Sequence, residues 1–100
     1  MDMQDHTPLT LYEKRLKEKL RPDFVEVLDD SLKHVQHHNA VSKGPSHLTI
    51  QIKCNPEHIK KPLVERHRAI YALFDAELKT GELHALRIIF LSSFFSFFFS

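Results

Sequence analysis

The sequence predicts an α+β sandwich: an αββαβ order of elements in which helices cover one face of a three-stranded mixed sheet. Apolar residues recur at helical spacing over residues 10–20 and again over 62–80, and apolar and polar residues alternate over 48–54 as in a half-buried strand. This order of elements is typical of a sheet with helices on one face. At 100 residues there is room for one such domain with a thin core.

The first helix is predicted to begin at Thr10, because Thr10 and Glu13 form the pattern of a capping box. Its buried face has apolar residues at every fourth position: Tyr12, Leu16 and Leu20. Pro22 ends this helix, since proline cannot continue the pattern of backbone hydrogen bonds. Residues 24–28 (FVEVL) are rich in β-branched and apolar residues, which predicts the first strand.

The second strand has the clearest pattern in the sequence. Its apolar positions are Leu48, Ile50, Ile52 and Cys54. Cys54 therefore falls on the inward face, and we expect it to be a small buried hydrophobic residue. Residues 29–46 join the two strands, show no periodicity and hold several histidines; a connection of this length is usually functional. Residues 55–61 form a second connection, with room for one helical turn.

A long second helix is predicted from Pro62 to about Thr80, with Gly81 placed to stop it. One apolar stripe runs along this helix: Leu63, Ile70, Leu73, Phe74 and Leu78. His67 lies on the edge of the stripe, one turn after Leu63. Residues 84–89 are predicted to form the third strand.

Composition excludes several classes of protein. The formal net charge of +1 gives no general electrostatic case for binding nucleic acid or a membrane. No hydrolase, kinase or dehydrogenase motif is present, so we expect no enzyme. The single cysteine fits a reducing compartment, and no leader is visible, so an intracellular protein is expected, with the cytosol favoured over the mitochondrion. Eight histidines are unusual and point to metal chemistry.

The end of the chain, IFLSSFFSFFFS from Ile89, differs in composition from the rest. It cannot span a bilayer, which takes about 20 apolar residues in a helix. Phe, Leu and Ser can all have pyrimidine-only codons, so our hypothesis is a misassigned exon end or a read-through, which sequencing the transcript would test. The alternative is a hydrophobic anchor. We thus expect a flexible terminus at 1–7, one domain at 8–90 and an atypical tail at 91–100.

Several stretches together resemble the BolA family over roughly residues 8–88. The family pattern has a strand ending in D-[DE]-S, a histidine-bearing loop, G-x-[ST]-H-F, R-H-R-x-[IV]-[YH] and E-L-x(n)-H-A-L. The matching stretches are FVEVLDDS at 24–31, GPSHL at 44–48, ERHRAIY at 65–71, EL at 77–78 and HAL at 84–86. They occur in the family order and at compatible spacing.

The resemblance implies a fold similar to a type II KH domain and a function in iron–sulfur assembly, delivery or iron regulation. It implies a non-enzymatic adaptor that pairs with a monothiol CGFS glutaredoxin and shares a [2Fe-2S] cluster with that partner and its glutathione. The histidine of R-H-R, here His67, is implied as one ligand. The loop histidine His34, or alternatively His37, is implied as the second.

A basic cluster near the start of the second helix is expected to contact the partner: Lys60, Lys61, Arg66 and Arg68. A KH-like nucleic-acid-binding regulator is the alternative function, although the chain lacks a G-x-x-G loop. His38 is expected to be exposed, and His47 and His84 to be structural. A zinc site of His34, His37 and His47 is a weaker alternative, because it lacks the paired cysteines of structural zinc modules.

The chain departs from the family pattern at three places. Residues 54–61 (CNPEHIKK) stand where the family has S-x-x-F-x-G and are one residue longer. Leu48 replaces the aromatic residue that follows the second-strand histidine. After Ile88 the usual T-P-x-E-W-like ending is absent. The first two departures are expected to affect packing, and the third to affect solubility.

Overall fold

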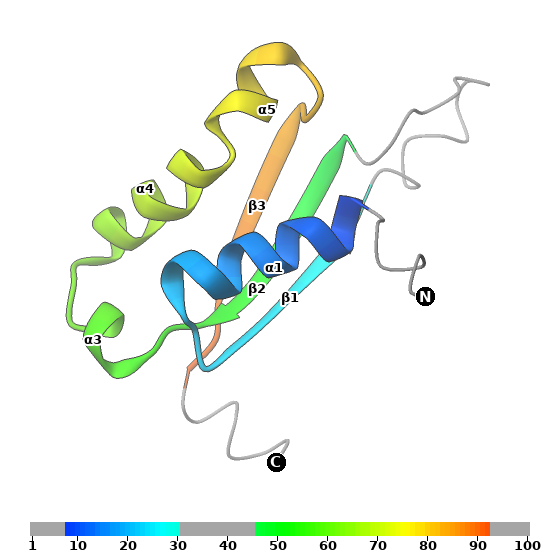
Figure 1. Ribbon diagram of the computed structural model, residues 1–100. Helices are drawn as coiled ribbons and strands as arrows, with labels where there is room; N and C mark the ends of the chain where they lie inside the picture. The colour runs from blue at the N-terminus through cyan, green and yellow to red at the C-terminus, as the bar shows by residue number, and fades with distance from the viewer. Residues whose placement is uncertain (1–7, 31–45, 93–100) are drawn as a thin grey trace.

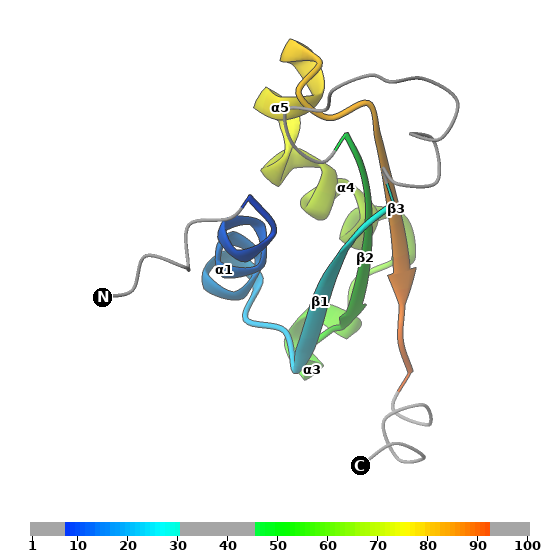
Figure 2. The ribbon, with the colours of Figure 1, turned by 90° about the vertical axis from the view of Figure 1, so that its right-hand side faces the viewer.

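The computed structural model describes residues 8–30 and 46–92. Its elements are α1 (Pro8–Leu20), β1 (Phe24–Asp29), β2 (His47–Lys53), α3 (Pro56–Ile59), α4 (Leu63–Leu73), α5 (Asp75–Thr80) and β3 (Ala85–Phe90). The helices lie on one face of the sheet, as Figures 1 and 2 show. This arrangement confirms the predicted α+β fold.

The three strands form one mixed sheet in the order β1-β2-β3. β1 pairs antiparallel with β2, and β3 pairs parallel with β2, so that Val27 lies opposite Ile50 and Ile50 opposite Ile88. A parallel pair needs a crossover connection, which the helices between β2 and β3 provide. Because β2 is the central strand and the helices cover its inward face, its inward side chains are buried. Ile50 and Ile52 are 0% exposed.

The first helix starts two residues earlier than predicted, at Pro8 instead of Thr10. Proline is accepted in the first helical turn because its missing N–H would have no partner there. The helix ends as predicted before Pro22, and Arg21 takes a left-handed conformation (φ 48°) that turns the chain toward β1. Tyr12 and Leu16 are buried against the sheet, which confirms the predicted apolar face.

Asn55 holds the end of α1 to the short helix α3. Its side-chain oxygen accepts a hydrogen bond from the backbone N–H of His58 at 2.7 Å and so caps α3. Its amide nitrogen donates to the carbonyl oxygens of Leu20 and Arg21, both at 2.9 Å. The helical turn for which residues 55–61 have room is thus formed and fixed by one polar side chain.

The long second helix predicted over 62–80 is two helices, α4 and α5, so this prediction is wrong. The break is at Phe74 (φ −114°, ψ 17°), whose ring is fully buried. In a continuous helix the carbonyl of Leu73 would accept the N–H four residues on. Here it accepts a hydrogen bond from the Arg15 guanidinium at 2.7 Å instead. Gly81 ends α5 in the left-handed region (φ 89°), as predicted.

Leu63 does not belong to the buried stripe that the sequence predicts. Its side chain is 56% exposed, whereas Ile70 and Phe74 are 0% exposed. Leu63 is the first residue of α4, two turns before Ile70, and lies before the part of the helix that packs into the core. Helical periodicity alone does not show where along a helix the contact with the sheet begins.

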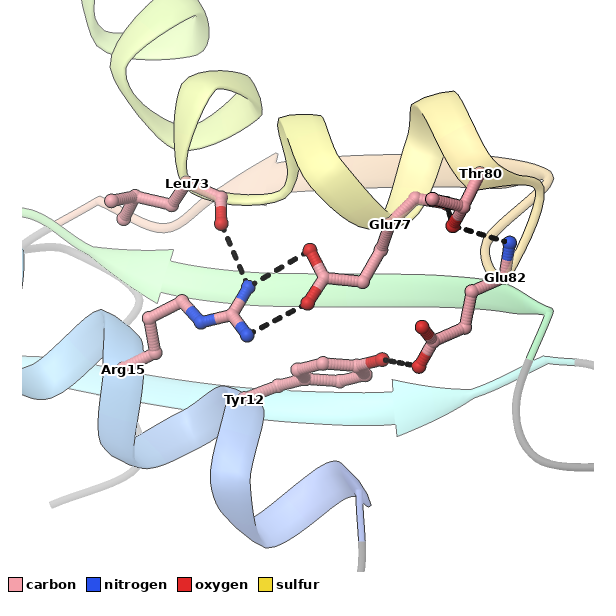
Figure 3. A network of polar contacts seen from close by, with 6 residues as sticks. All are labelled: Tyr12, Arg15, Leu73, Glu77, Thr80 and Glu82. Carbon is pink, nitrogen blue, oxygen red and sulfur yellow. Dashed lines mark hydrogen bonds and ion pairs between the residues drawn. The ribbon is translucent and has the colours of Figure 1, made fainter.

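A polar network joins α1 to α5 (Figure 3). The Arg15 guanidinium donates to both carboxylate oxygens of Glu77, at 3.1 and 2.8 Å, and lies over the rings of Tyr12 and Phe74. The Tyr12 hydroxyl donates to Glu82 at 3.2 Å. Burial and the neighbouring Glu82 carboxylate raise the pKa of Tyr12 to about 12, so this hydroxyl keeps its proton. The network fixes α1 against the break between α4 and α5.

We expect Arg15→Met to lower the free energy of unfolding by about 2 kcal/mol, because Glu77 and the Leu73 carbonyl lose charge-assisted donors. Urea unfolding followed by circular dichroism measures the change. Lys79→Met is the control, since it breaks an exposed ion pair with Asp75 and should cost less than about 0.5 kcal/mol. Equal losses in the two variants would contradict a structural role for the Arg15 contacts.

The Arg15–Glu77 pair also makes stability depend on pH. Hydrogen bonding to Arg15 holds the pKa of Glu77 below its usual value of 4.5. As the pH falls through 4.5, the unfolded chain therefore takes up the proton first, and the stabilisation is lost as the pH reaches the lower folded pKa. We expect the stability difference between wild type and Glu77→Gln to be largest at neutral pH and to shrink as the pH falls below 4.5. A difference that stays constant in urea unfolding across this range would contradict the assignment.

Candidate functional site

One end of the sheet gathers the starts of β2 and β3 and the end of β1. The N–H of Asp30 donates to the carbonyl of His47 at 2.8 Å, and the N–H groups of His84 and Ala85 donate to the carbonyl of Ser46 at 2.7 and 3.2 Å. The Thr49 hydroxyl donates to the Asp30 carboxylate. Thr49 is buried, although His47 and Gln51, on the same face of β2, are only partly buried. We call this region, formed by Asp30, Ser46, His47 and His84, the histidine end.

Two imidazoles lie close together at the histidine end. The ring centroids of His47 and His84 are 6.1 Å apart, and His47 Nδ1 lies 3.0 Å from the Ser46 hydroxyl oxygen. His84 is exposed and His47 is half-buried, so both can be reached from solvent. Imidazole nitrogens are good ligands for iron and zinc. The sequence predicts structural roles for these two histidines and contains no sign that they are neighbours.

The predicted loop ligands His34 and His37, and His38 beside them, lie outside the described residues. In the sequence His34 follows Asp30 by four residues, and the N–H of Asp30 donates to the carbonyl of His47 at the histidine end. Among residues 8–30 and 46–92, no group of three metal-ligating side chains is present.

The other predicted ligand, His67, is exposed on α4. Its ring stacks on Tyr71, with centroids 4.7 Å apart and planes at 22°. The Tyr71 hydroxyl donates to the carbonyl of Leu86 at 2.6 Å, near the start of β3, while Arg66 lies over Phe90 at the end of β3. Helix α4 therefore runs antiparallel to β3 (Figure 1), and His67 is one turn farther from the histidine end than Tyr71. His84, and not His67, is next to the ends of the loop.

The predicted basic cluster lies toward the opposite end of the sheet. Arg66 turns inward: its Nε donates to the Lys61 carbonyl at 3.0 Å, its guanidinium lies 5.2 Å from the centre of the Phe90 ring, and one nitrogen is 4.0 Å from the sulfur of Cys54. Cys54 is buried, as predicted. Lys60, Lys61 and Arg68 are exposed and remain accessible to a partner.

His58, in α3, has a pKa below its usual value because it is partly buried and faces the positive charges of Lys61 and Arg66. No helix in the described part of the chain is both long and apolar enough to cross a membrane.

Comparison with known proteins gives consistent matches. A family model described as BolA-like protein matches residues 16–93. SufE-like protein 1, chloroplastic/mitochondrial, of Arabidopsis thaliana is 39% identical over 80 residues, which are 76% of this chain and 21% of that protein. The chain thus spans about a fifth of that relative. The UV-induced protein uvi31 of Schizosaccharomyces pombe is 38% identical over 79 residues, 75% of this chain and 74% of that protein.

Solved structures agree with these matches. The BolA domain of SufE1 from Arabidopsis thaliana has a TM-score of 0.66 at 33% identity and covers 92% of this chain and 94% of its own. BolA1 from Arabidopsis thaliana has a TM-score of 0.72 at 28% identity, over 88% of this chain and 94% of its own. Sequence, described fold and solved structures lead to one conclusion: this chain belongs to the BolA family.

Proposed function

We propose that this chain is a non-enzymatic adaptor that binds a monothiol CGFS glutaredoxin and shares a [2Fe-2S] cluster with it, in iron–sulfur assembly, delivery or iron regulation. Membership of the BolA family supports the proposal, as does the name of the SufE-like relative. The observation that carries it is the accessible imidazole of His84, next to that of His47, at the end of the sheet where the histidine-rich connection starts and finishes.

The histidines of this chain fit the ligands of one of the two irons in a [2Fe-2S] cluster. Histidine can replace cysteine on one iron of a [2Fe-2S] cluster and raises its reduction potential. The only cysteine, Cys54, is buried, so thiolate ligands must come from the partner and its glutathione. Neither protein then has a complete ligand set, and binding of the cluster and binding of the partner become coupled.

The loop ligand of this proposal is His34, or alternatively His37, and two described histidines compete for the second position. The R-H-R resemblance favours His67. Proximity favours His84, because its backbone is hydrogen-bonded to Ser46 at the end of the loop and its ring is 6.1 Å from that of His47. We therefore prefer His84 as the second ligand and keep His67 as the alternative.

The exposed cations Lys60, Lys61 and Arg68 are proposed to meet acidic groups of the glutaredoxin, with Arg66 supporting them through the Lys61 carbonyl. This role belongs to the alternative in which His67 is the ligand, because Lys60, Lys61 and Arg68 lie near His67, on α4 or just before it. We propose an intracellular location, with the cytosol favoured and the mitochondrion as the alternative.

The decisive experiment is anaerobic reconstitution of the full-length chain with a CGFS glutaredoxin, glutathione, iron and sulfide, followed by visible absorption and circular dichroism. We expect a heterodimer spectrum that differs from that of the glutaredoxin alone. His84→Ala and His34→Ala should abolish this difference, because each removes a ligand from the same iron. His67→Ala should keep it.

His58→Ala is the matched control, because His58 lies in α3, which follows the end of β2, whereas the loop precedes the start of β2. The mixture with this variant should give the same spectrum as the wild-type mixture. Loss of the heterodimer spectrum in His67→Ala with retention in His84→Ala would show that the R-H-R histidine is the ligand. A wild-type mixture with only the glutaredoxin spectrum would overturn the cluster-sharing proposal itself.

A further inference from the structure

Six consecutive exposed residues form a corner between α3 and α4. The corner consists of Ile59, Lys60, Lys61, Pro62, Leu63 and Val64, and each of them is exposed. The exposed fractions of the three apolar side chains are 44% for Ile59, 56% for Leu63 and 53% for Val64. Single exposed apolar residues are ordinary, but three within one short segment mark an interaction surface. The preferred cluster ligands, His84 and a loop histidine, do not include them, and Lys60 and Lys61 contact the glutaredoxin only in the alternative in which His67 is the ligand.

The corner is held by defined contacts on both sides. The Asn55 cap fixes α3 before it, and the N–H groups of Glu65 and Arg66 donate to the Pro62 carbonyl after it. Arg66 also donates to the Lys61 carbonyl at 3.0 Å. The backbone of the corner is therefore fixed, and its apolar side chains are presented outward by that backbone.

The charges around the corner are mostly positive. Lys60 and Lys61 lie within it and Arg68 one turn beyond it, all exposed, while Glu57 and Glu65 are the acidic residues of the same stretch. Long lysine side chains can extend their charged ends away from an apolar surface while their stems stay on it. Apolar and basic groups are thus combined on one protruding segment.

The chain leaves the sheet at this same end. The Leu91 N–H donates to the Ile52 carbonyl at 2.8 Å, and Phe90 lies under Arg66, whose backbone adjoins the corner. Beyond the described residues the sequence continues as SFFSFFFS, which adds five phenylalanines and no charge. The chain therefore attaches strongly apolar sequence to the end of the molecule that carries the exposed corner.

We propose that the corner at 59–64 docks on a lipid bilayer that contains anionic lipids. Ile59, Leu63 and Val64 enter the boundary between headgroups and acyl chains, and Lys60 and Lys61 meet the anionic headgroups. A bilayer accommodates the apolar and the basic groups of this exposed segment together. The start of β2, where the histidine end lies, is far from the connection between α3 and α4 in Figure 1, so the histidine end is not part of the docking surface.

Flotation of the full-length chain with lipid vesicles tests this proposal. We expect binding to phosphatidylcholine vesicles with roughly 30% phosphatidylserine to exceed binding to pure phosphatidylcholine vesicles, and to weaken with salt. Lys60→Glu with Lys61→Glu, and separately Leu63→Ser with Val64→Ser, should each reduce binding to anionic vesicles about tenfold or more.

Leu11→Ser with Lys14→Glu on α1 is the matched control, because Leu11 is 48% exposed and Lys14 is exposed but lies away from the corner. This control should bind like wild type, and circular dichroism should show that all variants are folded. The proposal would be overturned if the chain did not bind anionic vesicles, or if it bound both vesicle types equally. It would also be overturned if both corner variants bound like wild type, because the binding would then be assigned to residues 93–100. His84→Ala should bind vesicles normally, so failure here and failure of cluster sharing are distinguishable.

Discussion

The contact of the Arg15 guanidinium with Glu77 and with the Leu73 carbonyl is the interaction on which the placement of the helices depends. The Arg15 guanidinium donates to the Leu73 carbonyl, which in a continuous helix would accept a backbone N–H, and the helix is broken at the next residue, Phe74. The backbone carbonyl of Glu77 in turn accepts the N–H of Leu83 at 3.0 Å. The next residue, His84, begins the approach to β3. A side chain on α1 thus helps to position an imidazole at the histidine end.

The features that the sequence predicts correctly depend on local patterns. Alternation over 48–54 identifies β2 and places Cys54 inward, because a strand exposes alternate residues whatever its neighbours are. Gly81 was identified as a stop because few other residues accept a positive φ. Element order then limited the fold to a small set, since sequential strands usually pair and a parallel pair needs a helical crossover.

The features that sequence could not supply depend on contacts between distant residues. The break at Phe74 involves Arg15, 59 positions earlier in the chain, and periodicity carries no sign of it. Leu63 matches the helical stripe yet lies before the part of α4 that meets the sheet. The closeness of His47 and His84 follows from the parallel register that places His47 opposite Ala85, which no pattern within either strand specifies. The R-H-R resemblance points to His67, whereas the tertiary structure brings His84 next to His47.

The two candidate surfaces are at opposite ends of the central strand, and this separation constrains how they can work together. β2 spans His47–Lys53, seven residues and roughly 20 Å. Its inward side chains Leu48, Ile50 and Ile52 are buried, so β2 is a closely packed spacer between the two surfaces. Occupation of the corner at 59–64 should therefore fix the orientation of the molecule without altering the geometry around His84. Any effect of a bilayer on cluster exchange would then come from local concentration and orientation of the two proteins, since a ligand that does not distinguish two conformations cannot shift an equilibrium between them.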